Sequence, residues 1–139
     1  MKQDWSSLLL LGVLTQFVVR KMTKGRLTLA QLVELAKSVG FPDPELAAAV
    51  AMAESGGSEL ALGDGGTSFG LWQIHTPAHP QYNGQSLFER DYNARAAFAI
   101  SQQGKNWRPW TTFRNGMYLR YYPKKPPPPA PPPETPPSA

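Results

Sequence analysis

Glu54 is the residue in this chain whose placement best suits acid–base chemistry. It stands near the end of an apolar run, Ala49 to Gly57, and a glycine-rich stretch, Gly63 to Ile74, follows soon after. A glutamate at the edge of a buried helix face loses hydration, which disfavours its charged form and keeps a proton available near neutral pH. Breaking a glycosidic bond needs such an acid, because the leaving oxygen must be protonated. The pattern predicts glycoside chemistry beside a groove for a long polar ligand.

Other side chains in this part of the chain could bind a ligand without reacting. His75 and His79 lie four residues apart in a proline-containing loop with no third ligand in view, which favours a polar groove wall over a metal site. We therefore expect no metal and no cofactor. Trp107 and Trp110 could stack on sugar rings, although tryptophans in a small domain more often belong to the core.

Two predicted helices lead up to Glu54. Thr28 and Gln31 make a capping box, and apolar residues recur at helical spacing until a glycine, which predicts a helix over residues 29–39. Asp43 then caps a second helix that has proline in its first position and ends at a glycine pair. The buried stripe of this second helix ends beside Glu54.

A glycine-rich loop and two further helices complete the predicted fold. Residues 56–84 are rich in glycine and proline, and their embedded aromatic side chains indicate an ordered, functional loop. A third helix is predicted over residues 91–103 and a short one near residues 114–122. The expected fold class is mainly α, a single domain with a groove formed by helices and by the glycine-rich loop or short strands.

The length of 139 residues leaves room for one compact domain and excludes a second catalytic domain. A hydrophobic content of 41% suffices for a core without metal or disulfides, and the lack of cysteine leaves the redox compartment open. We divide the chain into an apolar helix with a basic linker (1–27), the catalytic domain (28–122) and a proline-rich tail (123–139), which we expect to be a polyproline II linker.

The N-terminal segment is the candidate for contacts with partners. The apolar run from Leu8 to Val19 is too short to span a bilayer, and Asp4 and the missing cleavage site make a secretory signal peptide a poor fit. We expect residues 5–22 to form an amphipathic helix that packs on the domain, on a partner protein or on a membrane surface, with a weak export anchor left open.

The net charge of +4 is concentrated at the two ends of the chain, around an acidic middle. Such a surface suits a polyanionic matrix such as a bacterial cell wall, and it would also suit nucleic acid or anionic lipid. A protein that binds a membrane surface or nucleic acid is thus a rival interpretation. We expect no nucleic-acid partner, because no element interleaves a basic patch with aromatic residues.

The chain from Leu29 to Tyr122 resembles the lysozyme-like superfamily, in particular the soluble lytic transglycosylase and goose-type lysozyme families. The matching pieces are the helix-borne Glu-Ser at 54–55, Ser68 with the Gly-Leu-Trp-Gln-Ile stretch at 70–74, and the Asn-Ala-x-x-Ala of a buried helix at 93–97. A Glu-Ser-Gly alone is weak evidence. Together with the second stretch at this spacing it is strong.

The resemblance implies roles for these residues. Glu54 would be the general acid and base, and Ser55 would cap or steady the end of its helix. The stretch from Gly70 to Ile74 would be a strand that lines the sugar groove, with Trp72 in its floor and Gln73 as a hydrogen-bonding residue. Ser68 would orient Glu54 or contact an N-acetyl group.

The same resemblance leaves the reaction open at Asp64. This residue matches a Gly-Asp of goose-type lysozymes and would position an attacking water, which would give inverting hydrolysis, but Gly-Asp-Gly-Gly is also a good turn in any protein. His75 stands where goose-type enzymes carry another acid, and the tyrosine that many transglycosylases place near the acid is missing. Without a positioned water, the C6 hydroxyl of the sugar could close on C1 and leave an anhydro product.

The expected function is cleavage of peptidoglycan glycan strands, between N-acetylmuramic acid and N-acetylglucosamine. The small size and short appended segments resemble a bacteriophage product, associated with the virion or acting at the cell wall or periplasm, with virion proteins as possible partners of residues 5–22. The alternative is a non-catalytic wall-binding or structural virion module that keeps the fold. Intact Glu54, Ser55 and Gln73 count against that alternative.

Overall fold

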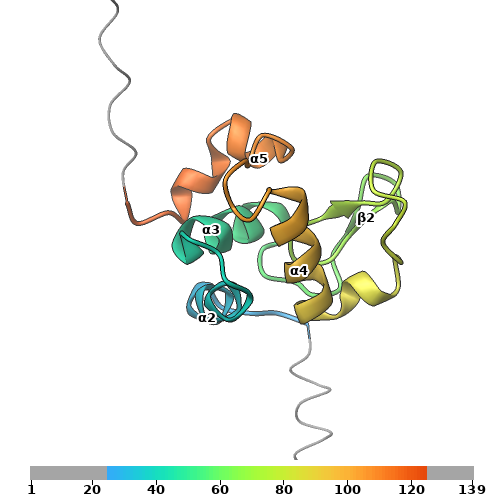
Figure 1. Cartoon of the computed structure of the whole chain (residues 1–139), viewed down its shortest axis with the longest axis horizontal. Coiled ribbons are helices and arrows are strands. Elements are labelled where there is room, and N and C mark those ends of the chain that lie inside the picture. The colour runs from blue at the N-terminus through green and yellow to red at the C-terminus, as the bar shows by residue number, and fades with distance from the viewer. Residues whose placement is uncertain (1–24, 125–139) are drawn as a thin grey trace, which may run out of the picture.

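Helices make up most of the fold, and one small antiparallel sheet accompanies them (Figure 1). The computed structural model describes residues 25–124. The helical elements are α2 (Leu29–Val39), α3 (Pro44–Ser55), η1 (Ser86–Phe88), α4 (Arg90–Ile100), α5 (Thr111–Arg114) and η2 (Met117–Arg120). The predicted helix over residues 5–22 and the tail beyond residue 124 lie outside the described residues. Within residues 25–124, no helix has the length and apolar character needed to cross a membrane.

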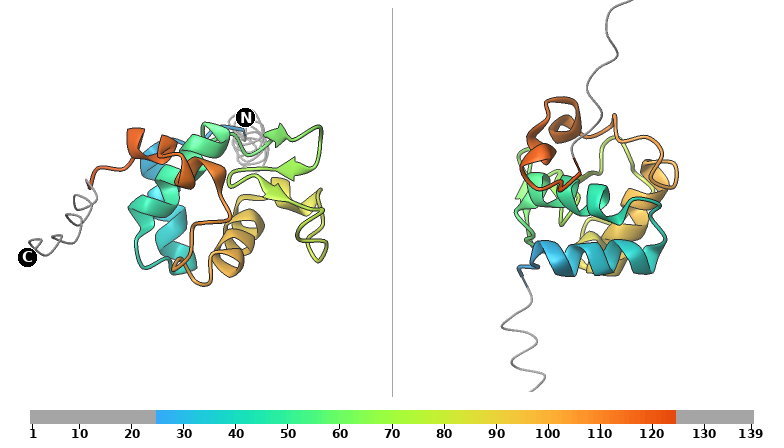
Figure 2. Two further views of the ribbon diagram at one scale, coloured as in Figure 1. Left: turned by 90° about the horizontal axis from the view of Figure 1, so that it is seen from above. Right: turned by 90° about the vertical axis from the view of Figure 1, so that its left-hand side faces the viewer.

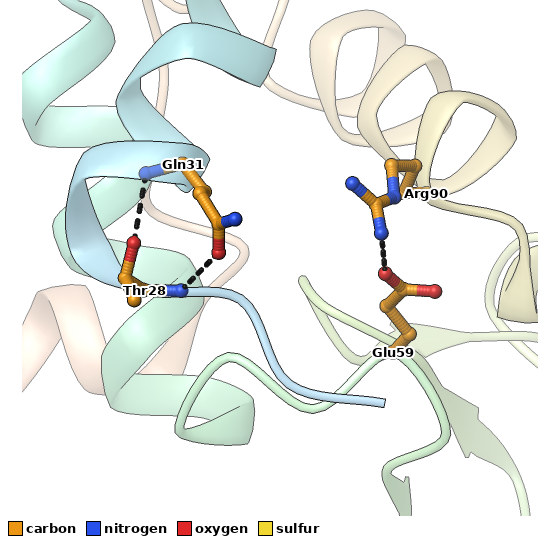
Figure 3. A network of polar contacts seen from close by, with 4 residues as sticks. All are labelled: Thr28, Gln31, Glu59 and Arg90. Carbon is orange, nitrogen blue, oxygen red and sulfur yellow. Dashed lines mark hydrogen bonds and ion pairs between the residues drawn. The ribbon is translucent and has the colours of Figure 1, made fainter. Parts of the chain in front are cut away.

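Helix α2 begins as its capping box predicts. Thr28 Oγ1 accepts from the backbone N–H of Gln31 (3.2 Å), and Gln31 Oε1 accepts from the backbone N–H of Thr28 (2.9 Å; Figure 3). These two bonds satisfy donors that the start of a helix otherwise leaves open. Gly40 ends the helix in a left-handed conformation with φ 105°. The helix predicted over residues 29–39 is therefore confirmed.

Helix α3 carries Glu54 and lies at the centre of the helical part. Asp43 caps it by accepting from the N–H of Leu46 (3.1 Å), and Pro44 occupies the first position. Residues 47–51 are all buried, and all but one are alanine. Their small side chains let neighbouring elements approach from two sides, so that α3 lies between α2 and the α5–η2 segment (Figures 1 and 2).

The loop predicted over residues 56–84 contains a three-stranded sheet at one end of the molecule (Figure 2). Its antiparallel strands, in the order of the chain, are β1 (Leu62–Gly63), β2 (Ser68–Phe69) and β3 (Ile74–His75). The strand predicted from Gly70 to Ile74 is wrong, because residues 70–73 form the turn between β2 and β3. Gly70 (φ 74°) and Gln73 (φ 47°) both adopt left-handed conformations that a strand does not contain.

The C-terminal helices are shorter than predicted. Helix α4 confirms the helix expected over residues 91–103 but ends before Gln102 and Gln103, because both adopt left-handed conformations with φ 54° and 62°. The short helix predicted near residues 114–122 is confirmed in part, because the short 3₁₀ helix η2 lies within this range and α5 ends at Arg114. Gly116, with φ 80°, separates α5 from η2 and turns this segment into two short pieces.

An aromatic cluster connects α3 to the turn between β2 and β3. Phe41 stacks on Trp72 and on Trp107, with ring centroids 6.0 and 5.5 Å apart, and Trp107 contacts Trp110 at 5.0 Å. The indole N–H of Trp72 donates to the carbonyl of Ala47 (3.0 Å), and that of Trp110 donates to the carbonyl of Trp72 (2.8 Å). Because each of these buried indoles has its partner, the cluster fixes the turn rigidly against the helices.

Two polar contacts tie distant segments together. Glu59, only 1% exposed, forms an ion pair with Arg90, which joins the segment after α3 to the start of α4 (Figure 3). The Tyr122 hydroxyl donates to Asp43 Oδ2 (2.5 Å), and this bond is the main reason that the pKa of Tyr122 is raised to about 12. The second contact closes the C-terminal end of the domain onto the start of α3.

Candidate active site

A pocket of about 580 Å³ lies between the end of α3, the sheet and the segment that leads into α5. Its lining consists of Glu54, Asp64, Thr67, Ser68, Gln73, Ile74, His75, His79, Ile100, Pro109, Trp110 and Thr111. Six of the eight site residues predicted from the sequence belong to this lining, and the two that do not are Ser55 and Trp72. The fold thus brings together most of the predicted site from segments far apart in the chain.

Glu54 enters the pocket from the C-terminal turn of α3. Its carboxyl is half-buried, and burial raises its pKa above the ordinary value, with the nearby charge of Asp64 acting in the same direction. The hydroxyl of Thr112 donates to Glu54 Oε1 (2.8 Å), and this bond, with a further one from the Thr112 backbone, opposes the rise without cancelling it. A carboxyl with a raised pKa keeps its proton to higher pH than an ordinary glutamate, which suits a group that gives up a proton and takes one back.

Asp64 reaches the pocket from the loop between β1 and β2. It adopts a left-handed conformation (φ 51°) between two glycines, and its Oδ2 accepts from the hydroxyl of Ser68 (2.5 Å). A β-carbon at Gly63 would lie 2.3 Å from Gln73 Oε1, so a larger residue there would have to displace the end of the Gln73 side chain. Asp64 therefore makes the turn and also lines the pocket, while its role toward an attacking water stays a prediction.

Ser68 forms a hydrogen bond with the carboxylate of Asp64 and not with that of Glu54, which was the expected partner. The resemblance implied that it orients Glu54 or contacts substrate, whereas its hydroxyl donates to Asp64. The same oxygen lies 3.2 Å from His75 Nδ1, and Thr67 Oγ1 lies 3.4 Å from that nitrogen. The orienting role toward Glu54 is corrected, because β2 places Ser68 within reach of the β1–β2 loop instead.

The histidines and Gln73 form part of the pocket wall. Burial lowers the pKa of His79, and the neighbouring His75 lowers it further, so that the wall gains little positive charge from His79 near neutral pH. Gln73 lines the pocket, but its amide nitrogen donates to the carbonyls of Ala61 (3.1 Å) and Gly70 (2.9 Å). Gln73 therefore braces the sheet, and its amide donors are engaged within the protein.

Two residues expected to touch substrate lie outside the pocket. Trp72 is fully buried in the aromatic cluster, so its assignment to the groove floor is wrong. Ser55 donates to the carbonyl of Ala51 (2.9 Å) and accepts from the N–H of Gly57 (3.2 Å). It steadies the end of α3, as expected, but its assignment as a substrate-binding residue is not supported. Trp110 does line the pocket, but it is only 5% exposed.

Sequence reasoning missed Thr112 and Thr67. Thr112 contacts Glu54 across 58 residues of chain, and Thr67 approaches His75 across a hairpin. Thr112 lies two residues after Trp110, and Thr67 lies next to Ser68. Neither threonine belongs to a local pattern that marks it, so only the meeting of the segments identifies them. Within residues 25–124, no group of three or more acidic or histidine side chains is placed to hold a metal ion.

A comparison with known protein families gives a match that covers this site. A family model described as a lysozyme-like domain matches residues 33–112, more than half of the chain, and this range contains the whole pocket lining. Neither the search of curated proteins nor the search of solved structures found a match. The family match points to a peptidoglycan-directed glycosidase or transglycosylase kind of function.

Proposed function

Because this chain belongs to the lysozyme-like domain family, we propose that it cleaves peptidoglycan at the β-1,4 bond between N-acetylmuramic acid and N-acetylglucosamine. The observation that carries the proposal is Glu54. It is a half-buried carboxyl with a raised pKa, and it lines an open pocket of about 580 Å³. Protonation of the leaving oxygen by such a group is the step that glycosidic cleavage requires.

Hydrolysis is the reaction that the pocket supports best. Asp64 lines the same pocket as Glu54, and the charge of Asp64 contributes to the raised pKa of Glu54. The two carboxyls therefore interact electrostatically within one pocket. In the proposed reaction, Glu54 gives its proton to the leaving oxygen. Asp64 takes a proton from a water that attacks the anomeric carbon, and the product has a reducing end.

Digestion of purified peptidoglycan followed by mass spectrometry tests this proposal. Wild-type protein should release muropeptides with reducing ends, and Glu54→Gln should release none. Glu34→Gln is the matched control, since Glu34 is an exposed residue of α2 that pairs only with Lys37 among the contacts of the described chain. Equal digestion by wild-type protein and Glu54→Gln would overturn the catalytic proposal.

The other outcomes separate the alternatives. Anhydro-muramyl ends would mean that the C6 hydroxyl of the sugar replaces water, with Glu54 still acting as acid and then base. Saturable binding to muropeptides without any product would indicate a non-catalytic wall-binding module. A bacteriophage origin, an action at the cell wall and a docking role for residues 5–22 stay predictions.

A further inference from the structure

Two hydroxyls of the pocket connect Asp64 to His75. Ser68 and His75 are directly paired across β2 and β3, so their side chains leave the sheet on the same face. Ser68 is 1% exposed, which holds its hydroxyl in one environment. Thr67, the neighbour of Ser68 in the chain, places its own hydroxyl 3.4 Å from His75 Nδ1.

The direction of these hydrogen bonds follows from the proton count. An ionised carboxylate can only accept, so the single hydroxyl proton of Ser68 goes to Asp64 Oδ2 at 2.5 Å. The hydroxyl proton of Thr67 likewise goes to the backbone carbonyl of Asp64 at 2.8 Å. Both oxygens can therefore only accept from His75, and Nδ1 must carry a hydrogen. Neutral His75 then has its lone pair on Nε2.

We propose that Ser68 and His75 are positioning residues that hold the Asp64 carboxylate for the attacking water and thereby favour hydrolysis over anhydro-sugar formation. His75 Nδ1–H orients the Ser68 hydroxyl, and this hydroxyl fixes Oδ2 of Asp64. Oδ1 is the oxygen that we assign to the water. The inference rests on the proposed function, because it concerns the role of Asp64 in that reaction.

The turn that carries Asp64 needs this support. Asp64 lies between glycines 63 and 65 in a left-handed conformation, and it is exposed, so its backbone alone does not fix the carboxylate. A misplacement of about 1 Å can cost about 100-fold in rate. With the water held loosely, the C6 hydroxyl of the bound sugar competes for the same carbon. The ratio of the two products therefore reports on the positioning of Asp64.

The first experiment reads the protonation of His75 without using activity. Nitrogen-15 NMR at a pH where the imidazole is neutral should show the hydrogen of His75 on Nδ1 in the wild-type protein. Thr67→Val combined with Ser68→Ala should return His75 to a mixture of tautomers, whereas Ser38→Ala, a serine at the exposed end of α2, should change nothing. An Nε2–H form of His75 in the wild-type protein would overturn the hydrogen-bond assignment.

The second experiment compares products from peptidoglycan. Ser68→Ala and His75→Leu should lower the kcat for reducing-end product by about 10- to 100-fold and raise the anhydro share, with little change in KM. His75→Asn should restore much of the wild-type ratio, because its amide can donate from a position close to Nδ1. Unchanged ratios in Ser68→Ala and His75→Leu, with full activity, would overturn the positioning role alone.

The remaining results of that comparison tell the two proposals apart. A wild-type protein that forms only anhydro ends would overturn the positioning role of Ser68 and His75 but leave Glu54 as the acid. A wild-type protein as inert as Glu54→Gln would overturn the proposed function, and the positioning role with it. The NMR result decides the hydrogen-bond assignment in either case.

Discussion

Substitution of Asn93 by alanine should destabilise the domain more than any change of an exposed residue. Asn93 is fully buried in α4, and its Oδ1 accepts from the N–H of Trp72 (2.9 Å). Its Nδ2 donates to the carbonyls of Phe69 (2.8 Å) and Leu87 (2.9 Å). Asn93 also touches Gly70 so closely that a β-carbon there would lie 2.4 Å from Nδ2. One side chain thus holds the turn between β2 and β3 against α4.

The magnitude follows from these bonds. A buried hydrogen bond contributes about 1 kcal/mol net, and a buried polar group left without a partner costs about 1–3 kcal/mol. Asn93→Ala removes all three bonds at once, so we expect a loss of about 3–5 kcal/mol in the free energy of unfolding. For a domain of this size, such a loss lowers Tm by roughly 12 °C or more. It is a large part of the about 5–15 kcal/mol that stabilises a typical domain.

Urea denaturation followed by tryptophan fluorescence measures this loss, since Trp72 and Trp110 are buried in the folded state. Asn115→Ala is the matched control, because Asn115 is exposed and accepts one bond, from the N–H of Met117 (2.9 Å). The control should lose less than about 1 kcal/mol. If Asn93→Ala also loses less than about 1 kcal/mol, the reasoning that Asn93 holds the turn is refuted.

Three further outcomes are expected. Thr112→Val removes a hydrogen bond that favours the charged form of Glu54, so the pKa of Glu54 should rise further. The alkaline limb of the pH–activity profile should then move to higher pH, and an unmoved limb would contradict an acid role for Glu54. Wild-type protein should lose stability as pH rises from about 4.5 through the raised pKa of Glu54, whereas Glu54→Gln has no carboxyl to ionise at this position. The Tm of Glu54→Gln relative to that of the wild type should therefore increase over this range, and a constant Tm difference would argue against the raised pKa. Trp72→Phe removes the hydrogen bond from the indole to Ala47 and should cost about 1–3 kcal/mol of stability, but it should leave KM unchanged. A raised KM would indicate that Trp72 contacts substrate after all.

The helices that carry the site could be predicted from the sequence because their signals are local. Thr28 and Gln31 cap α2 within a single turn, and Asp43 and Pro44 begin α3 in the same way. The apolar residues before Glu54 then place it where a buried helix meets solvent, and burial raises its pKa as that placement predicts. Caps and helical periodicity act over a few residues, so they can be recognised without the rest of the fold.

The pattern from Gly70 to Ile74 shows where local reasoning fails. Its apolar residues predicted a strand facing substrate, but Asn93, from a helix later in the chain, clamps this segment into a turn and Trp72 into the core. An apolar run indicates that its side chains will be buried, but it does not indicate which segment of the protein or which ligand they will pack against. The difference between a groove floor and a core tryptophan therefore depends on contacts that the run itself does not contain.

The sequence by itself determined the family of the fold and the helix that places Glu54 at the edge of a buried face, because these depend on residue types and short spacings. Only the tertiary structure decided the partners of the two carboxyls. Thr112 reaches Glu54 across 58 residues, and Ser68 donates to Asp64 because the register of a small sheet turns it toward the β1–β2 loop and His75. Such hydrogen bonds depend on where segments meet in space, because the two groups must lie about 3 Å apart. Residue types and their order along the chain do not specify that distance.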